Sequence, residues 1–456
     1  MECGHPDLLC GGDALRPRRG RRDRALHRVP PRRAVGTLEG GEAPLPKRGP
    51  THGRGRLGRR APNSPMLLRS LDRRHLALLG LLAAVVLTYS IIRGATSTSD
   101  FKNPYRVARV FWETGTLDIR GEPRYPPTVR VLLAPLAALP LGLAAAVWAL
   151  LNLAAVAALP GALERLSGAS LREQALPWLA VLPFMLDAFA LGQSDPINLF
   201  LVTAGLGLAR ASRPVTGAGL IGLAGMIKVL PVAFWGVPAV RRRLAATAAG
   251  ALMTLLASLA LLVVFAGWGP GLRGIAEWLT VLREQEGPWG LVATQNSLRE
   301  NNEALAIVLA RTFGDLDPGL LRNAVSLARL RLDVIWGIWV AILSAMMLTW
   351  VGCAVRARGA PSERGWLGMF ALTAVVMLVA SPIAWPHYFL WLLPAALFLA
   401  RRRRLLVAVA VLAPLGMMIP VLRGLGWHTA IALALFAIVA RELLTRSAPA
   451  PVAAGL

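Results

Sequence analysis

Long apolar runs follow one another along most of this chain, and short arginine clusters separate them. An α-helix needs about 20 residues to cross the hydrocarbon core of a bilayer, and several of these runs are shorter, so neighbouring loop residues must complete them. Hydrophobic residues make up 55% of the 456 residues and charged residues 16%, which is more apolar surface than a soluble core can absorb. The pattern therefore predicts an all-α polytopic membrane protein and argues against a set of soluble domains.

Ten membrane spans are expected, and one further stretch, 214–240, is interrupted by Lys228 and Pro231. The halves of that stretch are each about 12 residues long, too short to span separately, so we expect a re-entrant hairpin or a broken helix there. Allowing for this ambiguity, we expect a bundle of roughly 10–12 transmembrane helices. The spans are predicted near 75–92, 141–161, 175–191, 196–210, 243–267, 333–354, 366–380, 388–400, 404–422 and 428–441.

The arginine clusters give this span count an internal check, because loops rich in Lys and Arg stay on the cytoplasmic side of a membrane. The count places every cluster on one face, at residues 165–172, 210–213, 241–243, 356–358, 401–404 and 441–446. The opposite face then receives the polar and chemically varied segments, at 93–140, 192–195, 268–332, 381–387 and 423–427. We therefore expect the active face to be the outer one.

The two ends of the chain differ from the apolar body at 66–445. Residues 1–65 are rich in Arg, Pro and Gly and lack a hydrophobic period, so we expect a disordered extension, with translation beginning at Met66. Residues 446–456 are expected to be a C-terminal tail. The formal net charge of +25 arises from residues 1–65 and from the cytoplasmic loops, so we expect no nucleic-acid partner. Three Cys in the whole chain exclude a secreted disulfide scaffold.

Asp100 follows the end of the first span, at the membrane interface. A carboxylate in that position is costly unless it is paired or used, which makes it a functional candidate. The alternative is that Asp100 caps the following short helix, which Pro104 would help to start. Residues 104–113 are expected to form an interfacial amphipathic helix with its aromatic side chains at headgroup level, namely Tyr105, Phe111 and Trp112.

Two further sites have competing interpretations. Gln193 and Asp195 lie in a tight turn between two spans, where Asp195 is either a helix cap or a functional carboxylate. Lys228 is one of only three Lys residues in the chain, and its place inside the hairpin demands an anionic partner. A lipid phosphate and an intramolecular carboxylate are both open as that partner.

The last outer segments are rich in amides and aromatics. Residues 294–302 offer Asn and Gln side chains, which suit sugar hydroxyls because each amide both donates and accepts hydrogen bonds, although any solvated loop has the same composition. His387 stands between aromatic residues and could hold a phosphate or a sugar, or else belong to an interfacial aromatic belt. The sequence contains no phosphate-cradling glycine loop, no serine nucleophile elbow and no His/Cys spacing typical of a metal site.

Taken together, these segments resemble glycosyltransferase family 87 of the membrane GT-C superfamily, over about residues 75–442. The resemblance rests on six ordered pieces: Asp100 with Tyr105, residues 125–136, 192–196, 219–231, 295–298 with Arg311, and 381–387. The chain departs from the family pattern at Asp195, at Ala384 and in the order of Gln295 and Asn296, which leaves the exact sugar open.

The resemblance implies an integral membrane enzyme that transfers a hexose, with mannose expected, from a polyprenyl-phosphate donor. The acceptor would be an outer-leaflet glycolipid, glycan or protein, and transfer would invert the anomeric centre. Asp100 matches the catalytic Asp of the family and is expected to act as the general base. Donor or acceptor contacts are expected from His387, Lys228, Arg299, Tyr105, Tyr125, Gln193 and Asn296. The implied chemistry needs no metal and no cofactor beyond the lipid-linked donor.

Two readings compete with this one. A transporter or flippase for lipid-linked sugars would also use broken membrane helices with buried charge, but the sequence shows no obvious internal repeat. A non-catalytic subunit of an envelope-assembly complex would tolerate loss of the Asp100 carboxylate. The preference for Arg over Lys and for Ala and Gly hints at a GC-rich bacterial genome, so the expected location is a bacterial inner membrane.

Overall fold

The structure is a computed structural model, and all of its described residues lie within one unit, Leu68–Leu456. It describes residues 99–117, 125–285, 298–316, 326–358 and 362–445, together with scattered positions between 80 and 96. The predictions for residues 1–65, for a start at Met66 and for the tail at 446–456 lie outside the described residues. The first predicted span, 75–92, is described only at isolated helical positions.

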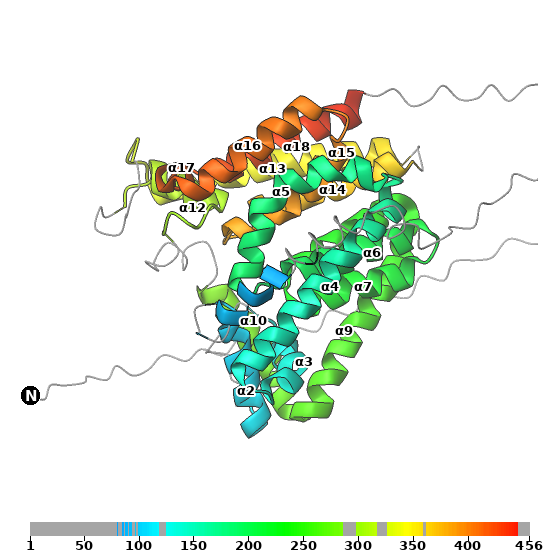
Figure 1. Cartoon of the computed structure of the whole chain (residues 1–456), viewed down its shortest axis with the longest axis vertical. Helices are drawn as coiled ribbons and strands as arrows, with labels where there is room; N and C mark the ends of the chain where they lie inside the picture. The colour runs from blue at the N-terminus through cyan, green and yellow to red at the C-terminus, as the bar shows by residue number, and fades with distance from the viewer. Residues whose placement is uncertain are drawn as a thin grey trace, which may run out of the picture. The chain divides into compact units, whose positions relative to one another are not determined.

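The described residues form helices, and their only β-type contact is one isolated bridge between Gly314 and Leu330 (Figure 1). In chain order the elements are α2 (Lys102–Thr114), α3 (Pro127–Ala137), α4 (Leu141–Ser167), α5 (Leu171–Leu191), α6 (Asp195–Arg210), α7 (Pro214–Ile227), η1 (Leu230–Trp235), α8 (Gly236–Pro238), η2 (Ala239–Arg243), α9 (Leu244–Ala266), α10 (Trp268–Gln285), α12 (Leu305–Phe313), α13 (Leu332–Ala357), α14 (Glu363–Ala380), η4 (Pro386–Leu392), α15 (Leu393–Phe398), α16 (Arg403–Met418), α17 (Pro420–Gly424) and α18 (Trp427–Thr445).

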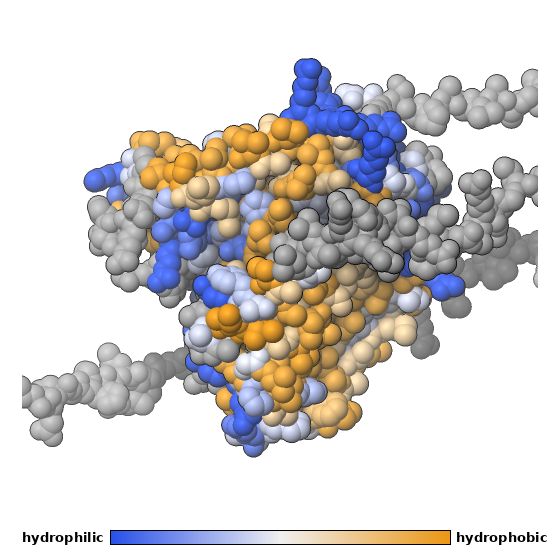
Figure 2. Space-filling view, in the orientation of Figure 1, coloured by the Kyte–Doolittle hydropathy of each residue, from blue (hydrophilic) through white to orange (hydrophobic). Residues whose placement is uncertain are grey.

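Six of these helical segments are long and apolar enough to cross a membrane: α4, α5, Leu230–Ala266, α13, α14 and α18. The prediction of an all-α polytopic membrane protein is therefore confirmed. The surface agrees with it, because α9 exposes Leu252, Leu255 and Val264, which suits contact with lipid tails. Figure 2 shows hydrophobic residues covering much of this face. The count of 10–12 spans stays a prediction, since α6 and α16 have only 16 residues each.

The stretch 214–240 forms a hairpin. Helix α7 ends at Ile227, and Lys228 takes an extended conformation with φ −149° and ψ 126°. The chain then returns along α7, because the Trp235 indole N–H donates to the Ala218 carbonyl at 2.8 Å. Helix α9 packs beside α7 in turn, with Gly222 against Thr254. Of the two expected arrangements, the structure shows the hairpin, with Lys228 at its tip.

The arginine clusters expected on one face do gather together. Arg210 pairs with Glu363 at 2.9 Å and also donates to the Arg165 carbonyl at 2.7 Å. Arg358 donates to the Val240 carbonyl at 3.1 Å, and Arg402 pairs with Glu442 at 2.6 Å. These bonds tie the loops that carry the clusters into one basic end of the fold, as the span count requires.

Several segments expected to be polar outer loops contain helices. The range 93–140 includes α3, and the range 268–332 includes α10 and α12. The helix predicted at 104–113 is present as α2, and its position at the membrane interface stays a prediction; of its aromatic side chains, Trp112 is 55% exposed. Phe111 is buried against Val131 and Leu262, because α3 and α9 cover that face of α2.

Candidate active site

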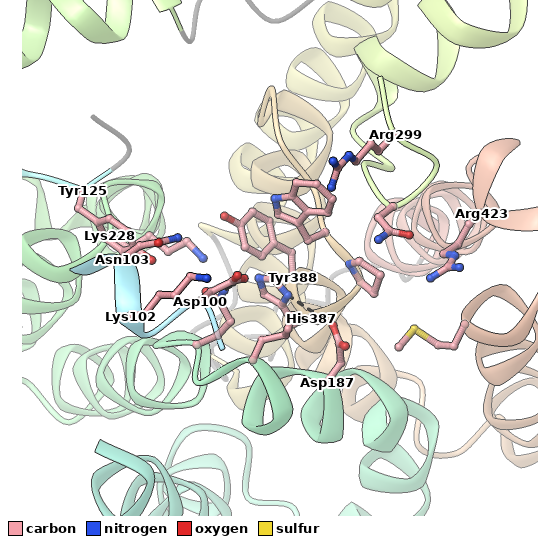
Figure 3. Close-up of a pocket in the computed structure, with 16 residues that line it drawn as sticks. Asp100, Lys102, Asn103, Tyr125, Asp187, Lys228, Arg299, His387, Tyr388 and Arg423 are labelled. Carbon is pink, nitrogen blue, oxygen red and sulfur yellow. Dashed lines mark hydrogen bonds and ion pairs between the residues drawn. The ribbon is translucent and has the colours of Figure 1, made fainter. Parts of the chain in front are cut away.

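A polar cavity of about 700 Å³ opens where several of the predicted outer segments meet. It is lined by Asp100, Lys102, Asn103, Tyr125, Asp187, Leu191, Gln193, Lys228, Arg299, Asn301, Trp385, Pro386, His387, Tyr388, Met417 and Arg423. Six of the eight predicted site residues are in this lining (Figure 3). Segments as distant in sequence as 100 and 423 therefore meet around one space.

Asp100 is held by the turn that follows α5. Its backbone N–H donates to the Leu191 carbonyl at 2.9 Å, and the Gln193 side-chain amide donates to its carboxylate at 2.7 Å. Gly192 makes this approach possible, since it adopts φ +66° and a Cβ there would lie 2.9 Å from that of Phe101. The result is an oriented carboxylate facing the cavity.

The alternative role of Asp100 as a helix cap is not supported. Helix α2 has Phe101 at its N-cap position and no side-chain cap hydrogen bond. The Gln193 amide orients the Asp100 carboxylate and places no further charge beside it. Asp100 can therefore accept a proton from a group bound in the cavity.

Lys228 and Asp195 form a buried ion pair, with 3.0 Å between Nζ and Oδ2. The other oxygen of Asp195 accepts from the Trp391 indole at 3.0 Å, and the Lys228 ammonium lies 3.7 Å from the centre of the Tyr388 ring. The partner of Lys228 is thus an intramolecular carboxylate. The cap interpretation of Asp195 is wrong, because Ser194 is the N-cap of α6 and no side chain caps that helix.

His387 lies between two carboxylates. Its Nδ1 is 3.5 Å from an Asp187 oxygen and its Nε2 is 4.0 Å from an Asp195 oxygen. The ring is 1% exposed, and no described residue hydrogen-bonds to either nitrogen. Both ring nitrogens therefore lie buried between the two carboxylates, at the wall of the cavity.

Asp187 is a site residue that the sequence analysis missed. It lies inside the predicted span 175–191, and its carboxylate points toward His387 in Figure 3. A signal was present, because an unpaired carboxylate within an apolar span is a functional candidate by default. Lys102, Asn103, Asn301 and Arg423 were also missed, although each lies in or beside a segment expected on the outer face.

Two predicted contacts are not found in the cavity lining. The Tyr105 hydroxyl donates to the Leu139 carbonyl at 2.8 Å, and its ring packs near Phe101, so this side chain joins α2 to the segment after α3. Asn296 lies outside the described residues. Tyr125, Gln193 and Arg299 do line the cavity, as expected of substrate contacts.

A second hollow, of about 630 Å³, is almost entirely apolar. It is lined by Val129, Leu132, Leu133, Leu136, Trp148, Leu151, Ala154, Ala155, Ala158, Ile197, Phe200, Leu201, Leu223 and Ile227. Ile227 in this lining directly precedes Lys228, which lines the polar cavity, so the walls of the two hollows contain adjacent residues. Within the described ranges, no group of three or more His, Cys, Asp or Glu side chains could hold a metal ion.

Comparison with known proteins gives one match. The family model for glycosyltransferase family 87 matches residues 124–382, which is more than half of the chain. Neither the curated proteins nor the solved structures include a significant match. The matched range contains Tyr125, Gln193, Lys228 and Arg299, whereas Asp100 lies before it and His387 after it.

Proposed function

The chain belongs to glycosyltransferase family 87 and is a membrane glycosyltransferase, and from this premise we propose that it transfers a hexose, specifically mannose, from a polyprenyl-phosphate donor to an outer-leaflet acceptor. The observation that carries the proposal is that the two hollows have adjacent residues in their walls. Ile227 lines the apolar groove, and the next residue, Lys228, lines the polar cavity, which also holds the Asp100 carboxylate. An apolar groove next to a polar cavity suits a substrate with a long hydrocarbon tail and a charged sugar-phosphate head.

The donor would bind with its prenyl tail in the groove between α3, α4, α6 and α7. Its phosphate would then lie at the groove end of the cavity, near Lys228 and Lys102. Negative charge grows on the phosphate as its bond to the sugar breaks, and cationic side chains stabilise that charge in the transition state. The charge of Lys228 is already compensated by Asp195. Lys102 therefore supplies the positive charge that balances the donor phosphate.

The proposed reaction is a single displacement. The acceptor oxygen forms a bond to the anomeric carbon as the bond from that carbon to the phosphate oxygen breaks, which inverts the centre. The acceptor proton passes to the Asp100 carboxylate, and the polyprenyl phosphate leaves with the bonding electrons. Gln193 orients the carboxylate through its 2.7 Å hydrogen bond.

The remaining lining residues take supporting roles in this proposal. His387 positions a phosphate or sugar hydroxyl, and Asp187 orients the imidazole from 3.5 Å. Tyr125 contacts the sugar, and Asn296 keeps the same role as a prediction. Tyr105 is left out, because its hydroxyl is already bonded to Leu139.

The proposed location is a bacterial inner membrane with the cavity on the extracytoplasmic side. The support for this orientation is the gathering of the arginine clusters at one end, since such clusters remain cytoplasmic. Much of the cavity lining comes from the opposite set of loops, including Asp100, Gln193, Arg299 and His387. The acceptor would accordingly be a glycolipid, glycan or protein at the outer leaflet.

The test compares wild type with Asp100→Asn in membranes that contain the full chain. Radiolabelled polyprenyl-phosphate mannose and a native lipid extract are supplied, and label in new glycoconjugates is counted. Asn keeps an oxygen for the Gln193 hydrogen bond, so the variant should fold while its transfer falls by about 100-fold or more. Asp333→Asn is the matched control, because Asp333 is 55% exposed and lies outside the cavity lining.

Equal transfer by wild type and Asp100→Asn would remove Asp100 from the mechanism. If wild type transfers no mannose but does transfer another hexose or a pentose from its polyprenyl-phosphate donor, that sugar replaces mannose in the proposal. Absence of transfer from every polyprenyl-phosphate sugar would overturn the donor class.

A further inference from the structure

Glu303 is a fully buried glutamate that lies outside the cavity lining and has no part in the proposed reaction. Its backbone N–H donates to the Ala384 carbonyl at 2.8 Å. Its carboxylate accepts the His428 backbone N–H at 2.8 Å, and its other oxygen lies 2.5 Å from the Nδ1 atom of the same histidine. Glutamate is almost never fully buried unless it has specific partners. Both of these partners hold the segment that carries His387.

The first contact fixes the chain just before His387. Ala384 lies three residues ahead of His387, and both of its backbone groups bond to residues 302–303. Its N–H donates to the Asn302 side-chain oxygen at 3.0 Å, and its carbonyl accepts from the Glu303 N–H. All three residues of this contact are at most 1% exposed, so water does not compete for the bonds. The backbone on this side of His387 is therefore held in place.

The second contact fixes the chain just after His387. Phe389 lies two residues beyond it in η4, and its ring centre is 5.3 Å from that of the His428 imidazole in α18. The His428 ring is itself held at both nitrogens, by Glu303 at Nδ1 and by the Ala413 carbonyl at 2.9 Å from Nε2. Glu303 thus acts on both flanks of His387, directly on one side and through His428 on the other.

His387 depends on this backbone support because no hydrogen bond holds its ring. Neither ring nitrogen has a hydrogen-bond partner among the described residues. The nearest acidic oxygens are 3.5 Å away on Asp187 and 4.0 Å away on Asp195, and Figure 3 shows His387 facing Asp187 across the cavity wall. The place of the two nitrogens is therefore set by the chain that carries the ring.

We propose that Glu303 is a positioning residue for His387: by holding the chain on both sides of the imidazole, it sets where the ring nitrogens meet the substrate. This inference rests on the proposed function, because the transfer rate reports the position of His387. Glu303 itself touches no substrate and acts only through His387.

The hydrogen-bond pattern identifies a conservative replacement for Glu303. The Ala413 carbonyl can only accept, so His428 Nε2 carries a proton. One further proton lies between Nδ1 and the Glu303 carboxylate, either on the ring or on the acid. The pair has the same net charge in both forms. A glutamine would keep these bonds, because its oxygen accepts the His428 backbone N–H and its amide donates to Nδ1 of a neutral imidazole.

The first experiment measures kcat/KM for transfer from radiolabelled polyprenyl-phosphate mannose, per amount of folded protein. Glu303→Leu should lower kcat/KM by about tenfold or more, because a displacement of about 1 Å at an active site costs much of the rate. Glu303→Gln should keep about a third or more of the wild-type value, since it keeps the bonds.

Gln174→Leu is the matched control. Gln174 is 1% exposed, donates to the Pro160 and Ala169 carbonyls, and lies outside the cavity lining. This variant also loses buried hydrogen bonds, so its unfolding temperature should fall. Its kcat/KM per folded protein should match that of wild type.

The second experiment repeats Glu303→Leu in a His387→Ala background. Once the imidazole is absent, Glu303→Leu should lower kcat/KM by no more than about twofold further. A general structural defect would lower kcat/KM by the same factor in both backgrounds, which would overturn the inference. Wild-type kcat/KM in Glu303→Leu or in His387→Ala, or a Glu303→Gln protein as impaired as Glu303→Leu, would overturn it too.

A structural measurement separates this inference from the proposed reaction, because it needs no donor. Hydrogen exchange of the peptide 383–389 is measured in detergent for wild type, Glu303→Leu and Gln174→Leu. The peptide should exchange about tenfold faster or more in Glu303→Leu alone. Unchanged exchange would overturn the positioning role even if transfer is detected. Absence of transfer from every polyprenyl-phosphate sugar would instead overturn the proposed function and leave the exchange result standing.

A milder variant serves if Glu303→Leu does not fold. Thr429→Val keeps the shape of the side chain and removes only the hydroxyl that donates to the Glu303 carbonyl. It should speed exchange of the peptide 383–389 by about threefold and lower kcat/KM to a similar extent. In the His387→Ala background it should have no further effect on kcat/KM. A Thr429→Val protein with wild-type exchange in this peptide would overturn the inference.

Discussion

The ion pair between Lys228 and Asp195 shows how a paired, buried carboxylate differs from one that faces the cavity. Asp195 is 1% exposed, and both of its oxygens are used, by Lys228 and by the Trp391 indole. A charge buried this deeply is tolerated only with its partner. The pair therefore closes the tip of the hairpin against α6 and η4. Asp100, by contrast, receives a hydrogen bond from the Gln193 amide and remains open to a ligand.

Lys228→Met should destabilise the protein by about 3 kcal/mol or more, because it leaves the buried Asp195 carboxylate without its counter-charge. The double variant Lys228→Met with Asp195→Asn should recover much of this loss, since Asn keeps an oxygen for Trp391. Thermal unfolding in detergent measures both changes. If the double variant is as unstable as the sum of the two single ones, the two side chains are not coupled.

At the scale of elements, the turn between α5 and α6 determines where the Asp100 carboxylate lies. Gly192 ends α5 in a left-handed conformation, with φ +66°. The side chain of the next residue, Gln193, donates a hydrogen bond to Asp100. The chain folds back tightly there because glycine has no Cβ to meet Phe101. This one turn brings the first outer segment and the α5–α6 loop to the same side of the cavity.

Gly192→Ala should destabilise the fold by about 1–3 kcal/mol, since it forces a strained backbone and a contact with Phe101. Transfer should fall as well, because Asp100 and Gln193 would separate. Gly207→Ala is the control: this position lies within α6 and has nothing within 4 Å of an added Cβ. Unfolding temperature and transfer rate are measured for both variants. A Gly192→Ala protein with wild-type stability and rate would contradict the role given to the turn.

Across the described part of the molecule, many charged residues lie in two regions, the arginine-rich loops and the cavity. The arginine-rich loops bond to one another, as Arg210 does with Glu363, while the cavity gathers the loops assigned to the opposite face. In the proposed reaction, protein cations at the cavity stabilise the phosphate charge, and the leaving phosphate needs no further activation. This arrangement predicts that cationic side chains compensate the charge of the leaving phosphate.

Removal of divalent metals should therefore leave transfer unchanged. The measurement is the transfer rate of wild-type membranes with and without excess EDTA, under otherwise identical conditions. Addition of Mg²⁺ or Mn²⁺ after chelation controls for indirect effects on the membrane. A loss of activity with EDTA that either metal restores would show that a metal ion takes part.

Sequence alone was sufficient for the features that depend on local pattern. Apolar runs of near-spanning length predicted an all-α membrane protein, and Lys228 with Pro231 predicted the interruption in 214–240. The motif positions of Asp100, Gln193 and His387 predicted that they would serve one site, and all three line the cavity. Periodicity, helix breakers and charge bias act within a few residues, so they can be read without knowledge of packing.

Tertiary structure alone decided which side chains face one another. In the folded chain, Lys228 pairs with the Asp195 carboxylate, and the Tyr105 hydroxyl donates to the Leu139 carbonyl. Asp187 and Arg423 line the cavity. It also joined Arg299 to Arg423 through Arg311, whose hydrogen bonds cross more than a hundred residues of chain. Such contacts depend on how helices pack against each other, and the periodicity of one helix does not specify the residues of its neighbour. For that reason the sequence indicated a polar site on the outer loops, and the packing of the helices determined which side chains line it.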